Sequence, residues 1–213
     1  MSSTTHRTAR SSEIEVFADV ACPFTHVGLR RFVERRTELG RRDVTLRVRA
    51  WPLEIVNGQT LDPHFIAEEV ADIRNQVAPT LFEQFAEDAF PASSLPALTI
   101  AAAAYERDLA LGERVSLALR DLLFEHGVDI ADTAVLHRLA AEHDVPVDLA
   151  DTRSVLDDHA EGVARGVIGS PHFFTPAGGF FCPSLDVHRD AAGHLRITAD
   201  TSGFDQFLTT CFE

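Results

Sequence analysis

A long helical stretch in the middle of the chain constrains the fold more than any other feature. Between residues 60 and 150 the apolar residues recur at helical spacing only, in segments separated by proline, glycine or aspartate. Roughly ninety residues of helical pattern are too many for a loop of a compact domain. We therefore expect an all-helical domain, residues 60–150, inserted into a second domain.

The segments before this stretch carry strand patterns. Residues 13–20 alternate apolar and polar side chains, and residues 43–50 do the same before a proline. A helical pattern lies between them and stops at Gly40. This order predicts a parallel β-α-β unit within residues 13–59.

The segment after the stretch, residues 151–213, completes the second domain. It contains one helical pattern, two short apolar runs separated by Ala177, Gly178 and Gly179, and a last helical pattern. Two apolar runs around glycines indicate a β-hairpin. The chain as a whole is therefore predicted to have an α/β fold with a helical insertion.

Charge and composition exclude several classes of function. The net charge of −14 comes from 33 acidic and 19 basic residues, so we expect no nucleic acid partner. The chain has no lysine, which excludes Schiff-base chemistry. No run approaches the roughly eighteen apolar residues of a membrane span. The polar residues 1–12 match no signal peptide and are expected to form a disordered tail, so we predict a cytoplasmic protein without a membrane partner.

Three cysteines, Cys22, Cys182 and Cys211, lie far apart in the sequence. Their number and spacing support neither a disulfide scaffold nor a zinc site. Cys22 falls at the predicted start of a helix, where free N–H groups favour an anion, so we expect a stabilised thiolate and a nucleophile. Thr25, one turn later, can donate its hydroxyl to the same sulfur. Cys211 lies on the apolar face of the last predicted helix and is expected in the core.

Four segments resemble the DsbA-like thioredoxin-fold oxidoreductases, including FrnE-like proteins. They are ADVACPFTHVG, RAWPLEIVNGQTLDP, LLFEHGVDIADTAVLHRLAAEHDV and GVIGSPHFFTPAGGFFCPSLD. The resemblance implies a thioredoxin-like fold (βαβ…ββα) with sheet order 2-1-3-4, interrupted by a helical domain. Members with full redox activity carry CxxC, whereas this chain has CPFT, so no disulfide can form within the motif. Related kappa-class glutathione transferases and 2-hydroxychromene-2-carboxylate isomerases carry a serine at the first position.

The resemblance also implies a binding surface around Cys22. In the family the proline matching Pro171 is cis and faces the cysteine, and the main chain of the residue matching Ser170 contacts a bound peptide or thiol. By analogy with glutaredoxins, the turn from Cys182 to Asp186 opens the last helix and holds the far end of a small thiol. The predicted binding residues are Pro23, Phe24, His26, Ser170, Pro171, Cys182, Ser184 and Asp186.

Several of these residues have simpler alternatives. Ser184 and Asp186 are equally well explained as a helix N-cap. His26 and His172 suggest a metal site with the cysteines, but ion pairing or packing is the commoner role, and we predict no metal. Cys182 is not expected to hold a resting disulfide with Cys22, because two strand spacings, about 9–10 Å, exceed the roughly 7 Å that a disulfide allows between Cα atoms.

Three functions remain open. In the first, Cys22 attacks a disulfide and is released by an external small thiol of the glutathione or mycothiol type, with no tightly bound cofactor. In the second, Cys22 and Thr25 activate a small thiol for isomerisation or transfer on an aromatic substrate. In the third, the protein is a non-catalytic binding module. The first is preferred, with a small thiol or disulfide as the partner; the oligomeric state is left open.

Overall fold

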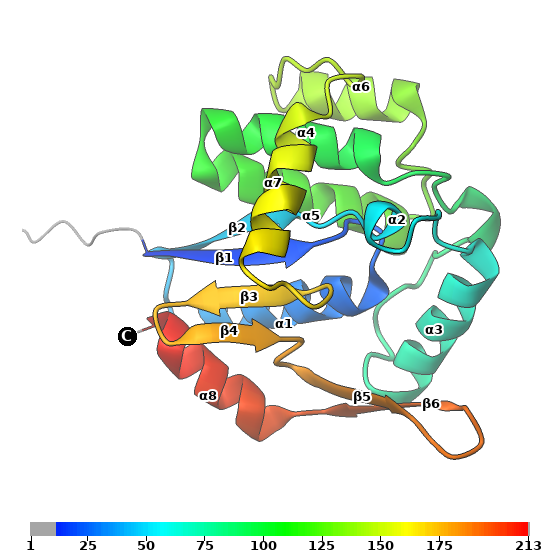
Figure 1. Ribbon diagram of the computed structural model, residues 1–213, viewed down its shortest axis with the longest axis vertical. Helices are drawn as coiled ribbons and strands as arrows, with labels where there is room; N and C mark the ends of the chain where they lie inside the picture. Colours follow the sequence, from blue (N-terminus) through cyan, green and yellow to red (C-terminus); the bar gives the residue numbers. More distant parts are fainter. Residues whose placement is uncertain (1–11, 213) are drawn as a thin grey trace, which may run out of the picture.

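The computed structural model describes residues 12–212 (Figure 1). At its centre is a four-stranded sheet with the strand order β2-β1-β3-β4. The strands span Ser12–Ala18 (β1), Val44–Ala50 (β2), His172–Thr175 (β3) and Gly178–Phe181 (β4). The predicted tail, residues 1–12, lies outside the described residues except for Ser12, with which β1 begins.

The connections of the sheet follow the predicted order. Strands β1 and β2 are parallel and are joined by helix α1 (Pro23–Glu38), while β3 is antiparallel to β1 and β4 to β3. Just beyond α1, Gly40 adopts a φ of 66°, which glycine tolerates without steric cost. Helix α8 (Thr201–Phe212) ends the described chain and shares a buried apolar cluster with α1 and the sheet. The thioredoxin-like sheet order 2-1-3-4 is therefore confirmed.

The chain between β2 and β3 is helical. Its elements are α2 (Leu53–Val56), α3 (Pro63–Gln76), the 3-10 helix η1 (Glu87–Ala89), α4 (Leu95–Arg107), α5 (Leu109–Phe124), α6 (Thr133–Glu142) and α7 (Arg153–Ala164). Figure 1 shows α4, α5 and α6 gathered at one end of the molecule and α3 at its side. The predicted helical insertion is confirmed. Within residues 12–212, no helix combines the length and the apolar character that a membrane crossing requires.

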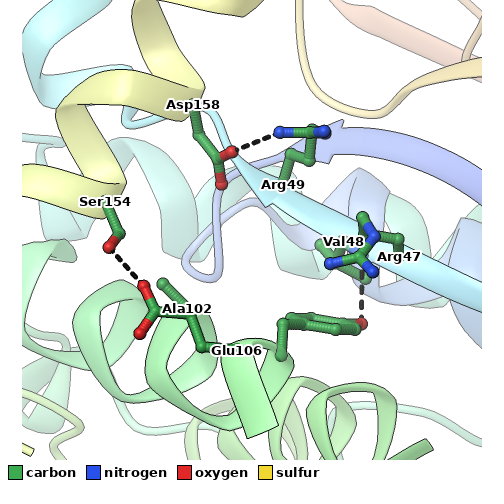
Figure 2. A pocket seen from close by; sticks show the side chains of 8 residues that line it. Arg47, Val48, Arg49, Ala102, Glu106, Ser154 and Asp158 are labelled. Carbon is green, nitrogen blue, oxygen red and sulfur yellow. Dashed lines mark hydrogen bonds and ion pairs between the residues drawn. The ribbon is translucent and has the colours of Figure 1, made fainter. Parts of the chain in front are cut away.

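Side chains from three helices occupy the outer edge of β2. Three backbone N–H groups of this strand donate to them: Leu46 to Glu113 of α5 (3.2 Å), Val48 to Tyr105 of α4 (3.0 Å) and Ala50 to Asp158 of α7 (2.9 Å). Figure 2 shows this region, a cavity of about 200 Å³ in which Asp158 also pairs with Arg49 at 2.8 Å. Because free N–H groups at a sheet edge invite another strand to pair, these side chains close this edge.

A second sheet of two strands separates β4 from α8. It consists of β5 (Leu185–Arg189) and β6 (Leu195–Ala199), paired antiparallel. The prediction that residues 182–186 open the last helix is therefore wrong. The physical reason is the alternation of apolar and polar residues in both segments, and a turn in which the Asp190 carboxylate accepts two backbone N–H groups at 2.9 Å.

Candidate active site

Cys22 lies in the short connection between β1 and α1 and is the N-cap residue of the helix. Its backbone is extended (φ −87°, ψ 116°), and Pro23 follows as the first helical residue, where its missing N–H costs no hydrogen bond. The Asp19 carboxylate accepts the backbone N–H of Ala21 at 2.8 Å and so fixes the connection. The thiol is largely enclosed, since Cys22 is only 4% exposed.

Ser170, in the loop before β3, lies against this thiol. The Cys22 Sγ donates to the carbonyl oxygen of Ser170 at 3.4 Å, and the hydroxyls of Ser170 and Thr25 are hydrogen bonded at 2.8 Å. The backbone N–H of Asp19 donates to the Ser170 hydroxyl at 2.9 Å. The structure thus brings two predicted site residues, Thr25 and Ser170, to Cys22.

Pro171 continues the contact with α1. The peptide bond between Ser170 and Pro171 is cis. A Cβ placed on Gly28 of α1 would lie 3.6 Å from the Pro171 ring and 3.7 Å from the Ser184 hydroxyl oxygen, so the helix passes close to both residues. The carbonyl oxygen of Pro171 accepts the backbone N–H of Cys182 at 2.9 Å, which places Cys182 directly beside the same loop.

The protonation state of Cys22 differs from the sequence-based expectation. Burial raises the pKa of the Cys22 thiol above its ordinary value, and the nearby charge of Glu69 raises it further. Hydrogen bonds from the Thr25 side chain and backbone, and from the Ser170 side chain, lower the pKa but do not offset burial. The expectation that the Cys22 thiolate is stabilised relative to a free cysteine is therefore wrong, because the sequence did not reveal how completely the thiol is removed from water.

A cavity of about 420 Å³ adjoins the Ser170 loop. Its lining residues are Phe24, Ser170, Phe181, Cys182, Leu185, Asp186 and Val187. Four of them, Phe24, Ser170, Cys182 and Asp186, were predicted binding residues. Leu185 and Val187 were missed because β5 was not predicted, although the alternating sequence Leu185-Asp186-Val187 is a signal for it. Phe181 was missed although its strand was part of the predicted hairpin.

The other four predicted binding residues, Pro23, His26, Pro171 and Ser184, do not belong to this lining. Pro23 is buried in the first turn of α1. Ser184 is 2% exposed and its hydroxyl has no hydrogen-bond partner within residues 12–212, while its carbonyl oxygen accepts Arg31 at 2.8 Å. Since β5 rather than a helix follows Ser184, the alternative of a helix N-cap is also wrong.

His26 does not face the cavity, which corrects its predicted binding role. Its side chain is enclosed between the rings of Phe82 and Phe124, and Nε2 lies 2.6 Å from a Glu125 carboxylate oxygen. Burial lowers the pKa of His26, although the Glu125 carboxylate opposes this. His26 therefore joins α1 to the helical insertion, the ion-pairing and packing role that the sequence left open.

A buried polar pair beneath the β1–α1 connection was missed by sequence reasoning. The Asp19 carboxylate accepts the Leu53 backbone N–H at 2.6 Å and the Ser94 hydroxyl at 3.1 Å, and burial raises its pKa. The Arg120 guanidinium, 1% exposed, donates to the carbonyl oxygen of Asp19 at 3.2 Å and to Ser116. Burial lowers the pKa of Arg120 to about 10. These groups fix the strand end that carries Cys22.

Comparison with known proteins agrees with this architecture. The family model of the DSBA-like thioredoxin domain matches residues 13–191. The chain belongs to the DsbA-like thioredoxin domain family. No curated protein sequence matches this DsbA-like chain.

Solved structures show the same fold at low identity. The cytosolic disulfide reductase DsbM from Pseudomonas aeruginosa is 16% identical, with a TM-score of 0.59 over 93% of this chain and 97% of that one. A structure of DsbM with GSH is 15% identical, with a TM-score of 0.60 over 93% of this chain and 98% of that one. A 2-hydroxychromene-2-carboxylate isomerase is 15% identical, with a TM-score of 0.55 over 79% of this chain and 88% of that one. The resemblance of this DsbA-like protein to these structures concerns the fold alone.

Proposed function

We propose that this protein is a thiol-disulfide oxidoreductase in which Cys22 is the single nucleophile of the motif. The observation that carries this proposal is the contact of Cys22 with Ser170, a residue that also lines the cavity of about 420 Å³. A substrate sulfur held in that cavity lies next to the loop that contacts the thiol. The N-terminus of α1 and the two Thr25 donors stabilise the negative charge when Cys22 loses its proton.

The reaction begins with the thiolate of Cys22. It attacks one sulfur of a disulfide R–S–S–R′, forms the mixed disulfide Cys22–S–S–R and releases R′ as a thiolate. Thr25 stands where a second thiol would resolve this intermediate, and its hydroxyl cannot do so. An external thiol therefore attacks the mixed disulfide and regenerates Cys22. Because burial keeps resting Cys22 protonated, the first step accelerates as the pH rises.

The external reductant is proposed to be a low-molecular-weight thiol of the glutathione or mycothiol type, bound only during turnover. The cavity of about 420 Å³ falls within the range of small-molecule sites, which is about 300–1,000 Å³. The choice of thiol is supported by the structure of DsbM, a protein of the same fold, which was solved with GSH. We place the reaction in a reducing compartment, the cytoplasm.

A second candidate is a thiol-dependent isomerase or transferase. It is favoured by the apolar side of the cavity, where Phe24, Phe181 and Leu185 provide contacts for an aromatic substrate. In that case the hydroxyls of Thr25 and Ser170 bind the thiolate of a small thiol, and Cys22 forms no covalent bond with substrate. Disulfide reduction is then absent even though a small thiol binds.

The test is the reduction of a peptide that carries one glutathione mixed disulfide. Glutathione and 2-mercaptoethanol serve in parallel as reductants, because the second needs no binding site. We expect catalysis by the wild type, loss of catalysis in Cys22→Ser, and retention in Cys211→Ser, whose substituted residue is buried on α8 away from the cavity. Equal rates for wild type and Cys22→Ser would refute the proposal. An unreactive Cys22 would leave a non-catalytic binding module.

A further inference from the structure

Cys182 is a second thiol next to the site, and the reaction proposed above does not use it. It follows β4 and lines the same cavity as Ser170, while its backbone N–H is bonded to the Pro171 carbonyl oxygen at 2.9 Å. Its φ of 42° is a left-handed conformation, which is unusual for a residue other than glycine. This geometry turns the chain sharply between β4 and β5 and holds Cys182 at the cavity wall.

The sulfur of Cys182 is close enough to Cys22 for the charge of an ionised Cys22 to act on it. Burial raises the pKa of Cys182 to about 12, and the charge of the Cys22 thiolate contributes to this rise. The Arg31 guanidinium lowers the pKa of Cys182, and Arg31 is fixed beside it by bonds to the carbonyl oxygens of Ser184 (2.8 Å) and Val77 (3.1 Å). In the resting structure both thiols are free.

We propose that Cys182 is an internal resolving thiol, which attacks the mixed disulfide formed by Cys22 in place of the external thiol; the external thiol then acts only on the disulfide of the protein. This inference rests on the proposed function, because Cys22 must first react with a disulfide. In the step, the bond between Cys22 and the group R breaks, a bond between the sulfurs of Cys22 and Cys182 forms, and R leaves as a thiol with the proton of Cys182. The substrate disulfide is thereby reduced by the two protein thiols, and two equivalents of external thiol reduce the protein again.

The charges around Cys182 depend on the state of Cys22. While Cys22 is a thiolate, its charge opposes ionisation of Cys182. Once Cys22 is part of a mixed disulfide it carries no charge, and this opposition disappears. Arg31 then stabilises the Cys182 thiolate without competition from a second anion. Cys182 reacts after Cys22 because the bond that it attacks is the mixed disulfide that Cys22 has formed.

Formation of the internal disulfide requires a local movement. Strand β3 lies between β1 and β4, so the two strands are separated by about 9–10 Å, whereas a disulfide needs Cα atoms within about 7 Å. We infer that the corner at residues 182–184 moves, since it follows β4, an edge strand with no further strand beyond it in the described sheet.

The test uses 5,5′-dithiobis(2-nitrobenzoic acid), an aromatic disulfide that releases a coloured thiolate at each exchange. If Cys182 resolves the intermediate, the wild type releases two equivalents and ends with a Cys22–Cys182 disulfide and no adduct. Cys182→Ser releases one equivalent and keeps the adduct on Cys22. Cys211→Ser, the matched control, behaves like the wild type. Arg31→Met slows the second release more than the first. Intact mass and peptide mapping identify each product.

The possible outcomes separate this inference from the proposed function. A stable Cys22 adduct in the wild type after one equivalent overturns internal resolution and leaves the Cys22 reaction intact. Two adducts, one on each cysteine, also overturn it, because Cys182 then reacts with the reagent rather than with Cys22. Release that is unaffected by Cys22→Ser shows that the proposed function itself is wrong.

Discussion

The hydroxyl oxygens of Thr25 and Ser170 lie 2.8 Å apart, although 145 positions separate these residues in the sequence. Both residues also contact the Cys22 sulfur: hydrogen bonds from each lower the pKa of Cys22. The threonine that replaces a second motif cysteine is therefore part of a polar arrangement that supports the first one. It stabilises the thiolate without being able to form a covalent bond.

Replacing Thr25 by valine removes the hydroxyl and keeps the shape of the side chain. A hydrogen bond to a charged group contributes about 1.5 kcal/mol, which corresponds to roughly one pH unit. We therefore expect the midpoint of Cys22 alkylation to move upward by about that amount in Thr25→Val. The measurement is the rate of iodoacetamide labelling against pH, with peptide mapping to separate the three cysteines.

Thr25→Ser keeps the hydroxyl and serves as the control, so its midpoint should stay close to that of the wild type. A valine variant with an unchanged or lower midpoint would show that the threonine hydroxyl does not stabilise the thiolate.

Glu69 of α3 is expected to slow the reaction of Cys22 above neutral pH. Burial raises the pKa of Glu69 to about 7, so the carboxyl group is mostly ionised at pH 8, where its charge raises the pKa of Cys22. Glu69→Gln removes this charge and should increase the alkylation rate of Cys22 at pH 8 by roughly twofold. The neighbouring exposed residue provides the control: Glu68→Gln should leave the rate unchanged. A slower Glu69→Gln variant would contradict the electrostatic explanation.

The sequence predicted the parts of this structure that depend on local patterns. The alternation before Cys22, the proline after it and the helical spacing of residues 60–150 were sufficient for the β-α-β unit and the insertion, whereas the sheet order 2-1-3-4 came from the family resemblance. The contacts of Cys22 with Ser170 could be anticipated only from the family resemblance, because nothing local connects residues so far apart. The hairpin β5–β6 has a local signal in the alternation around Val187, but the glutaredoxin analogy pointed to a helix instead.

Burial was the quantity that the sequence could not provide. Asp19 and Arg120 look like surface residues by type, yet both are fully enclosed. His26 has the spacing of a residue that faces Cys22, whereas the helical insertion covers it with aromatic rings. The raised pKa of Cys22 has the same origin, since desolvation depends on every segment that covers the thiol.

Arg120→Met is expected to destabilise the protein by about 3 kcal/mol, because it leaves the Asp19 carbonyl oxygen and the buried Asp19 carboxyl group without their cationic neighbour. Urea unfolding followed by circular dichroism measures the change. Arg114 lies exposed on the same helix, and Arg114→Met should cost less than about 0.5 kcal/mol. Similar stabilities for the two variants would exclude a structural role for the buried guanidinium.

His172 makes the stability of the protein depend on pH. Its Nδ1 accepts the backbone N–H of Ile168 at 3.2 Å, and burial together with the charge of Arg165 lowers its pKa. An unfolded histidine has a pKa of about 6.5, so below that pH the unfolded chain binds more protons than the folded one. The contribution of His172 to the free energy of unfolding is therefore complete above pH 6.5 and declines as the pH falls.

His172→Asn retains an acceptor for Ile168 but does not titrate in this range. We expect the loss of stability between pH 7 and pH 5.5, measured by urea unfolding, to be smaller in this variant than in the wild type. His137, exposed on α6, supplies the control, since His137→Asn should leave the pH dependence unchanged. Identical pH profiles for wild type and His172→Asn would show that His172 is not the titrating group.

The side chains on the outer edge of β2 give the helical insertion a protective role. Glu113, Tyr105 and Asp158 come from α5, α4 and α7, and together they occupy the N–H groups that an incoming strand would need. A truncated protein without α4, α5 and α7 would leave the backbone N–H groups on the outer edge of β2 without these partners. We expect this truncated protein to aggregate and precipitate, because strands of neighbouring molecules can then pair with the exposed edge of β2.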